Sequence, residues 1–128
     1  MQPPLEEIVA TASFRAALRR FLRRTERCAR DNGLTPRQYL LLLLVKGAPD
    51  GSEKATISDL VERLALTQST VTELVQRAEE AGLITRETSV DDGRINLLRV
   101  TPEGGERLLA TYDALGAERQ QLLELLHQ

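Results

Sequence analysis

A single amphipathic period runs through the first quarter of the chain. From about Leu5 to Asp31, apolar residues recur at steps of three and four, and arginines stand between them. This pattern predicts a helix of about seven turns. Such a helix is too long to be covered by the rest of a chain of 128 residues. We therefore expect a fold in which part of the long helix needs a partner for its apolar surface.

The core must be built almost entirely from aliphatic side chains. Hydrophobic residues make up 41% of the chain, but aromatic residues make up 3% and tryptophan is absent. Leucine, valine, alanine and isoleucine in such excess favour packed helices over a β-sandwich. The longest apolar run, Tyr39 to Val45, is far shorter than the ~20 residues that span a bilayer, so we expect no membrane segment. The length and the 28% of charged residues predict one compact globular unit.

Cysteine and histidine usage excludes several classes of protein. Cys28 is the only cysteine and His127 the only histidine, so an intramolecular disulfide and a multi-cysteine zinc site are impossible. We expect no metal, no cofactor and no enzymatic activity, because no nucleophile stands beside a base and no phosphate-binding loop is present. The lone cysteine and the lack of a secretory pattern at the start favour the cytoplasm. Cys28 lies on an apolar helix face and is interpreted as a packing residue; nearby Arg24 and Arg27 would favour an oxidant-sensing thiolate instead.

Hydroxyl side chains mark the predicted helix starts. Thr35-Pro36 predicts the start of a second helix, which is apolar nearly all round and is therefore expected to be buried. Ser58 is expected to cap a short helix over residues 59–65. Thr67 is expected to cap another helix over residues 68–81.

Gly82 is expected to end the helix over residues 68–81, and the spacing of apolar residues changes after it. Residues 83–88 and 95–100 predict two strands, and an Asp-Gly pair between them supplies the positive φ that a hairpin needs. A second threonine-proline pair then predicts a last helix over residues 102–126, with a bend near Gly116.

Two short helices joined by a tight turn form a helix-turn-helix, and the hairpin that follows would be its wing. We therefore predict a mainly α fold with a small β-hairpin, a winged helix-turn-helix. A helix fits the major groove of DNA, about 12 Å wide, where each base pair shows its own hydrogen-bond pattern. Val71, Leu74 and Val75 are expected to face inward, which leaves polar residues outside. The candidates for major-groove contact are Gln68, Ser69, Thr70, Thr72, Gln76 and Arg77.

Residues outside that helix complete the candidate DNA surface. Arg94 lies at the predicted hairpin tip, where a cationic side chain could enter a narrow minor groove, oriented by Asp92. The alternative is a surface arginine paired with Asp91 or Asp92. Thr35 and Ser58, at helix starts, are candidates for phosphate contact.

The sequence also resembles a known family. Its motifs are Gly33-Leu34-Thr35-Pro36, Gln38-Tyr39, Ser69 to Thr72, Gly82-Leu83-Ile84, Asp92-Gly93-Arg94 and Val100-Thr101 before a Glu-Gly pair. Together these motifs look like those of the multiple antibiotic resistance regulator (MarR) family, and the resemblance covers nearly the whole chain. It implies one domain over residues 1–128, with a DNA-binding part at about 34–101 and dimerisation helices at about 5–31 and 102–128.

The resemblance implies a homodimeric transcription regulator whose DNA affinity is lowered by a small ligand or by thiol oxidation. The leucine-rich tail and the long first helix favour a homodimer on their own, because they carry more apolar surface than one small domain can hide. Two-fold symmetry would place two such helices about 34 Å apart on a roughly palindromic site. The expected partners are double-stranded DNA, a second copy and a small-molecule effector that shifts the spacing of the two helices, in a repressor or an activator. The alternative is a protein-interaction module without DNA binding, which the acidic Glu79-Glu80 would suit.

Overall fold

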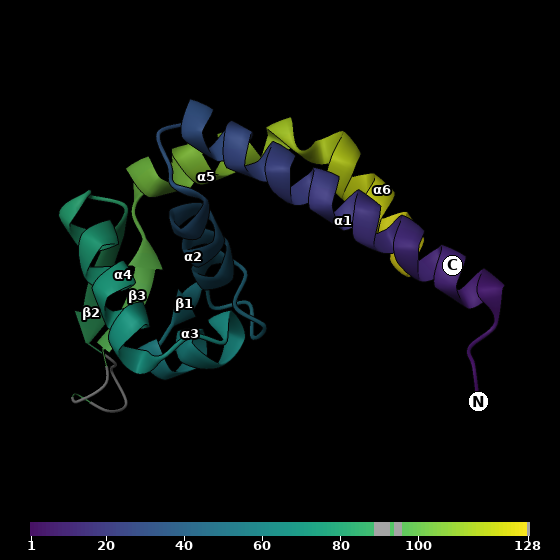
Figure 1. Ribbon diagram of the computed structural model, residues 1–128. Helices are drawn as coiled ribbons and strands as arrows, with labels where there is room; N and C mark the ends of the chain where they lie inside the picture. Colours follow the sequence, from purple (N-terminus) through teal and green to yellow (C-terminus); the bar gives the residue numbers. More distant parts are fainter. Residues whose placement is uncertain (89–92, 94–95, 128) are drawn as a thin grey trace.

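The chain folds into an arch in which two helices form an arm at one end of a compact lobe. The computed structural model describes residues 1–88, 93 and 96–127. We call α2, α3, α4 and the small sheet the lobe, and α1 with α6 the arm; α5 joins the two (Figure 1). In chain order the elements are α1 (Leu5–Asp31), α2 (Pro36–Lys46), β1 (Lys54–Ala55), α3 (Ile57–Leu64), α4 (Gln68–Glu80), β2 (Ile84–Thr88), β3 (Asn96–Val100), α5 (Pro102–Ala114) and α6 (Gly116–Leu126). The predicted mainly helical winged fold is confirmed.

The sheet is small and antiparallel. Its strand order is β1-β3-β2, so β3 lies in the middle. The register pairs Ile84 with Val100 at one end of the hairpin and Thr88 with Asn96 at the other. The two strands predicted from the change of period are therefore confirmed, and β1 adds a short third strand beside β3.

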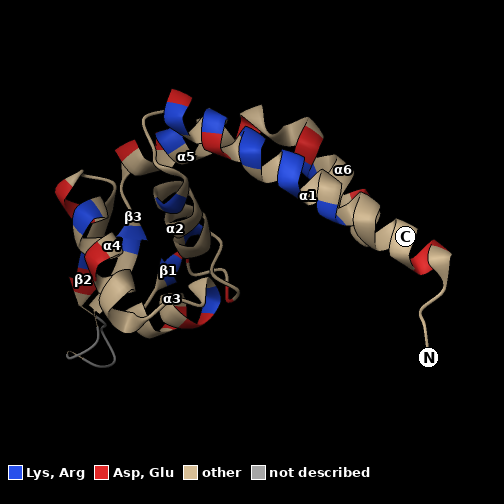
Figure 2. Ribbon diagram, viewed as in Figure 1, with Lys and Arg blue, Asp and Glu red and all other residues tan. Residues whose placement is uncertain are grey.

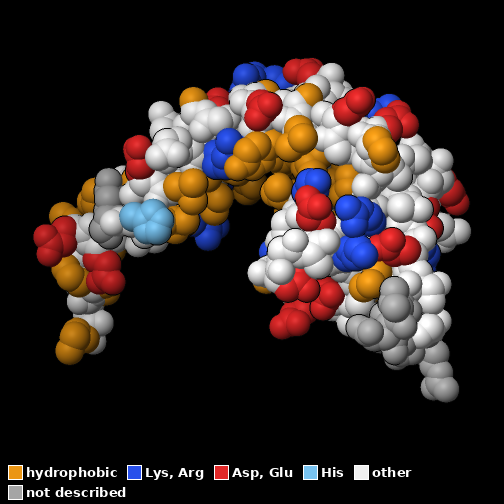
Figure 3. Space-filling model, turned by 180° about the vertical axis from the view of Figure 1, so that it is seen from behind, with side chains coloured by type: hydrophobic (Ala, Val, Ile, Leu, Met, Phe, Trp, Pro, Cys, Tyr) orange, Lys and Arg blue, Asp and Glu red, His pale blue; other side chains and the backbone are white. Residues whose placement is uncertain are grey.

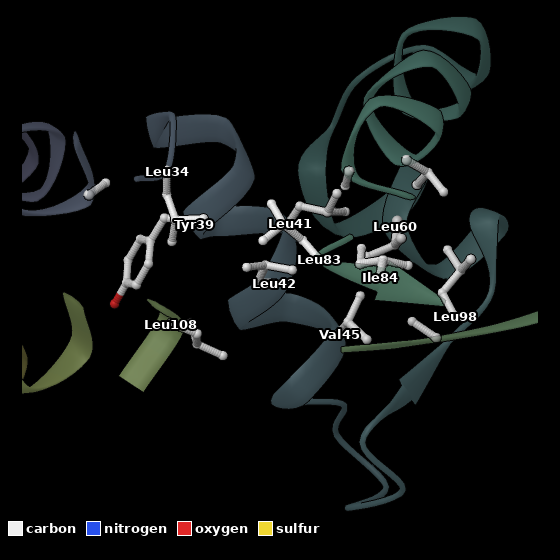
Figure 4. Close-up of a cluster of buried hydrophobic side chains, with 14 of the residues drawn as sticks. Leu34, Tyr39, Leu41, Leu42, Val45, Leu60, Leu83, Ile84, Leu98 and Leu108 are labelled. Carbon is white, nitrogen blue, oxygen red and sulfur yellow. The ribbon is translucent and has the colours of Figure 1, made fainter. Parts of the chain in front are cut away.

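The core of the lobe is aliphatic and centred on α2. Leu41, Leu42 and Val45 have no exposed surface, and each such burial stabilises the fold by roughly 1.5–3 kcal/mol. The predicted burial of α2 therefore holds for this side of the helix, while Leu40 on the other side is 43% exposed. Residues from other parts of the lobe join the cluster: Leu60, Val71, Val75, Ala78, Leu83, Ile84 and Leu98. Leu34, Tyr39 and Leu108 extend it toward α5 (Figure 4).

The start of α2 follows the predicted chemistry. The Thr35 hydroxyl accepts a hydrogen bond from the Gln38 backbone N–H at 3.1 Å, and the Gln38 side chain accepts from the Thr35 N–H at 3.0 Å. Pro36 occupies the first helical position, where a missing N–H costs nothing. The cap predicted for α4 is also confirmed, because the Thr67 side chain accepts from the backbone N–H of Thr70.

The cap predicted for α3 is wrong. Thr56, not Ser58, precedes the helix, and its hydroxyl accepts from the Asp59 N–H at 3.1 Å while the Asp59 carboxylate accepts from the Thr56 N–H at 3.0 Å. Thr56 is favoured because a carboxylate stands three residues later and closes a reciprocal pair of bonds. Ser58 has Val61 at that spacing, which can return no hydrogen bond.

The last helical segment, predicted as one helix with a bend near Gly116, is divided at that place into two helices. The break falls at Leu115, which is fully buried and is followed by Gly116. Arg119 of α6 contacts Tyr112 of α5 across the break. Its Nη1 donates to the Tyr112 carbonyl at 2.7 Å, and its guanidinium carbon lies 3.5 Å from the centre of the Tyr112 ring. Beyond the break, α6 continues away from the lobe beside α1, where Arg24 and Glu118 form an ion pair at 3.4 Å (Figure 1).

The arm leaves much of its apolar surface uncovered. Only Cys28 and Ala29 of α1 are buried, and no residue described in α6 is. Figure 3 shows apolar side chains continuing from the underside of the arch along the arm. None of the helices in the described part of the chain combines the length and the low charge needed to cross a bilayer. The large apolar side chains exposed on the arm and α5 are Leu5, Ile8, Val9, Leu22, Leu109, Tyr112, Leu123 and Leu126.

A network of bonds joins the turn after α4 to the start of α5. The Thr101 hydroxyl donates to the Gly82 carbonyl at 2.6 Å, and the Thr101 N–H donates to the Leu83 carbonyl at 3.0 Å. Gly82 has φ +76°, a conformation that glycine adopts without strain. Gly104 lies so close that a Cβ there would collide with the Leu83 carbonyl oxygen. The lobe and the helix that leads to the arm are therefore in direct backbone contact.

Candidate nucleic-acid interface

Helix α4 has one apolar face and one polar face. Val71, Val75 and Ala78 are fully buried and Leu74 is half-buried, so these four side chains fix the helix against the lobe. The opposite face is open to solvent. Of the residues predicted to contact the major groove, the structure places Gln68, Ser69, Thr72, Gln76 and Arg77 on this exposed face.

Thr70 differs from the other candidates. It is half-buried, and its Oγ1 accepts a hydrogen bond from the Thr67 hydroxyl at 2.8 Å. The Thr67 oxygen also lies 3.3 Å from the Ser69 hydroxyl. Thr70 is thus part of the polar network at the start of α4, where its hydroxyl accepts one bond and keeps its own O–H to donate.

The acidic residues of α4 are largely matched by arginines. Glu73 Oε1 lies 2.6 Å from Arg77 Nη2, one helical turn further on. Glu79 pairs with Arg86 at 2.8 Å and so connects α4 to β2. Glu80 is exposed and forms no ion pair with any residue that the structure describes. Figure 2 shows one basic position between acidic ones along this helix, so the arginine that pairs with Glu79 comes from the neighbouring strand and not from α4 itself.

A hollow of about 280 Å³ separates the start of α2 from α4. It brings Thr35 close to the α4 residues although they are far apart in sequence. Arg37 is a cation in the first turn of α2 and forms no ion pair among the described residues. The sequence interpretation missed Arg37, although a basic residue is unfavourable at the positive end of a helix unless an anion is near. The hollow is lined by Thr35, Arg37, Gln38, Thr70, Glu73, Leu74 and Arg77.

The remaining candidates are not brought into this group. Ser58 lies in the first turn of α3 but does not line the hollow. Arg94 and its predicted orienting residue Asp92 lie outside the described residues. The strands that lead to them end at Thr88 and Asn96.

Two polar side chains of the described chain, the Cys28 thiol and the Tyr39 hydroxyl, belong to the buried core. Within the residues described, no group of three His, Cys, Asp or Glu side chains converges on one point. Cys28 is 3% exposed and belongs to the apolar core, which agrees with its interpretation as a packing residue. Tyr39 is also buried, and this burial raises the pKa of its hydroxyl while the nearby Arg119 guanidinium opposes the rise.

Comparison with known sequences identifies the family. The profile of the MarR family matches residues 32–95, which is half of the chain. The chain is 38% identical over 71 residues to the organic hydroperoxide resistance transcriptional regulator of Bacillus subtilis, across 56% of this chain and 46% of that protein. It is 31% identical over 105 residues to a proposed transcriptional regulatory protein for the hcr operon of Thauera aromatica, across 82% of this chain and 59% of that protein. The chain thus spans about half the length of these relatives.

Solved structures show the same fold. A mutant MarR from Escherichia coli in complex with operator DNA matches with a TM-score of 0.68 and 19% identity, over 91% of this chain and 81% of that one. BpsR of Bordetella bronchiseptica, whose DNA binding is regulated by 6-hydroxynicotinic acid, matches with a TM-score of 0.64 and 20% identity, over 88% and 77%. With the sequence match over half its length, and with this fold, the chain belongs to the MarR family.

Proposed function

We propose that this protein is a sequence-specific DNA-binding transcriptional regulator that acts in the cytoplasm and is not an enzyme. One observation carries the proposal: α4 is fixed by its apolar side and presents an exposed polar side, next to a hollow that the Arg37 cation also lines. A helix mounted in this way can enter the major groove while neighbouring groups bind phosphates. Gln68, Ser69, Thr72, Gln76 and Arg77 would contact base edges, with Thr70 shaping the helix start.

Phosphate and minor-groove contacts would hold the helix in place. We assign phosphate contact to Arg37 and Thr35, which line the hollow beside α4, and to Ser58 at the start of α3. Arg94 would enter the minor groove from the wing, with Asp92 orienting it.

The regulator is proposed to act as a homodimer. The apolar side chains exposed on the arm are the support, because a monomer would leave them in water. A two-fold axis through α1 and the last two helices would present two copies of α4 to a roughly palindromic operator, about 34 Å apart.

A small-molecule effector is proposed to release the operator. The support comes from the family: DNA binding by BpsR is regulated by 6-hydroxynicotinic acid, and the Bacillus subtilis relative is named for organic hydroperoxide resistance. An effector bound where the arm meets the lobe would change the spacing of the two α4 helices. Buried Cys28 is a poor sensor for this purpose, so we favour ligand binding over thiol oxidation.

Binding to labelled genomic fragments tests the proposal. The full chain should shift fragments at low salt, and the affinity should fall as salt rises. Arg37→Ala and Arg94→Ala should each weaken binding to all sequences and lower the slope of log affinity against log salt by about 0.9 for each phosphate that is no longer neutralised. If no fragment is shifted at low salt, the protein-interaction alternative replaces this proposal.

Analytical ultracentrifugation tests the homodimer. The unaltered chain should sediment as a dimer at micromolar concentration, and Leu123→Glu should shift it toward the monomer. Gln120→Glu is the matched control, because it adds the same charge at an exposed polar position of α6. A monomeric unaltered chain contradicts the homodimer.

A further inference from the structure

The exposed face of α4 has an acid near its centre. Glu73 follows Ser69 by four residues and precedes Gln76 by three, so the three side chains share one face of the helix. Its side chain is 61% exposed. A carboxylate on a surface that meets DNA is repelled by the phosphates, so its presence at this point needs a physical reason.

Stability does not supply that reason. Glu73 pairs with Arg77 at 2.6 Å, but the Arg77 side chain is 73% exposed and such a surface pair contributes little to folding. The pair instead fixes where the two groups lie. The carboxylate holds one guanidinium nitrogen, which leaves the other guanidinium N–H groups and the second carboxylate oxygen to bind an outside partner.

The pair presents hydrogen-bond donors directly beside an acceptor. In the major groove, a G·C pair shows two acceptors on guanine (N7 and O6) followed by the donor N4 amino group of cytosine. Guanidinium N–H groups match the two guanine acceptors, and a carboxylate oxygen beside them accepts from cytosine. An A·T pair reverses this match, because its N6 amino group would face the arginine and the thymine O4 acceptor would face the carboxylate.

We propose that Glu73 and Arg77 form one unit that selects a G·C base pair in each half of the operator. Glu73 is the specificity-determining residue of the unit, because its carboxylate rejects the thymine oxygen. This inference rests on the proposed function, since it requires α4 to enter the major groove. It also explains why an acid stands on this face: Glu73 lowers affinity for DNA in general and raises the discrimination against the wrong base pair.

Selection from a random double-stranded DNA library tests the inference. The full unaltered chain, Glu73→Ala, Arg77→Ala and Glu80→Ala would each be sequenced after enrichment, and their affinities for an unrelated duplex measured. Glu80 is the matched control, because it is an acid two turns from Glu73 on the same helix and has no ion pair among the described residues.

Glu73→Ala should reduce the preference for G·C about tenfold at one base pair of each half-site. Arg77→Ala should change the preference at that same base pair. The two variants should shift affinity for the unrelated duplex in opposite directions, upward for Glu73→Ala and downward for Arg77→Ala. Glu80→Ala should raise that affinity and leave every base preference unchanged.

Two results would overturn the inference while the proposed function stands: Glu73→Ala keeps every base preference of the unaltered chain, or it alters a different base pair from Arg77→Ala. If the unaltered chain enriches no sequence, the proposed function fails as well, and the two failures are therefore distinguishable.

Discussion

The lobe and the arm differ in how much of their apolar surface is covered within one chain. Every element of the lobe contributes side chains to one closed core, and Leu60 and Leu98 have no exposed surface at all. The arm helices lie side by side but leave Leu5 75% exposed and Leu126 62% exposed. The lobe is therefore complete in one chain, whereas the arm has a surface that only another molecule can cover.

The helix starts show the same difference. The helices α2, α3, α4 and α5 each begin with a threonine whose hydroxyl accepts a backbone N–H of the first turn. The arm helices begin at Pro4 and Leu115, and neither residue provides a side-chain cap. Local hydrogen bonds thus specify the helices of the lobe, while the arm depends on packing.

The largest effect is expected from truncating the closed core. Leu60→Ala should lower the free energy of unfolding by about 2–5 kcal/mol, because it leaves a cavity among fully buried neighbours. Leu126→Ala at the end of the arm should change it by less than about 0.5 kcal/mol in dilute protein. Urea unfolding at low concentration measures both. Equal changes would mean that the arm is closed in the monomer and that the comparison is wrong.

A pair of glycines tests the junction between the two regions. Gly104→Ala should destabilise the protein by roughly 1–3 kcal/mol, because the added methyl group meets the Leu83 carbonyl. The neighbouring Gly105 has open space around it, so Gly105→Ala should stabilise α5 by about 0.5–1 kcal/mol. Thermal unfolding of the two variants should give shifts of opposite sign. Shifts of the same sign would show that the contact at Gly104 does not constrain the junction.

Local capping in the lobe gives a smaller effect. Thr56→Ala should cost about 1 kcal/mol, because the threonine hydroxyl satisfies a backbone N–H in the first turn of α3. Ser58→Ala should cost close to nothing by the same denaturation measurement. A larger destabilisation by Ser58→Ala would restore the serine as the residue that specifies α3.

The smallest effect is a pH dependence confined to the lobe. Lys46 lies 2.6 Å from Glu53 and holds the pKa of that carboxyl below its usual value, with Arg99 contributing less. Since the folded pKa is lowered, the stabilisation is complete above the ordinary carboxyl pKa and is lost as the pH falls through the lowered value. Glu53→Gln should therefore be less stable than the unaltered chain at pH 7, and the difference should shrink as the pH falls below the ordinary carboxyl pKa. If the difference in stability does not change with pH, the ion pair between Lys46 and Glu53 does not stabilise the folded protein.

Periodicity and turn chemistry predicted most of the fold. The bounds of α1, the threonine cap of α4 and the hairpin all follow from local patterns that the tertiary structure preserves. The α3 cap was missed because a serine and a threonine compete within three residues, and only the acid at position 59 decides between them. The sequence predicted a bend and not a division of the last helix. The division depends on the burial of Leu115 and on the hydrogen bond from Arg119 to the Tyr112 carbonyl, and both form only in the folded chain.

The buried and exposed sides of α4 were predictable from the sequence, but the ion-pair partners of its charged residues were not. Alternation of apolar and polar residues was enough to place Gln76 outside and Val75 inside. The partners of Glu73 and Glu79 could not be assigned in advance, because a surface acid can pair along its own helix or across to a strand. Arg37 approaches α4 only through the packing of α2 against it, so nothing in the local sequence of α4 indicates it.

The bonds between the turn after α4 and the start of α5 have a mechanical consequence. Thr101 and Gly104 hold that turn by hydrogen bonds and by close contact, so the axis of α5 cannot tilt without carrying the end of α4 with it. Under the proposed function, a molecule that tilted α5 would also move the end of α4 without touching its exposed polar face. Binding beside α5 and binding to α4 would then depend on the same angle between these two helices.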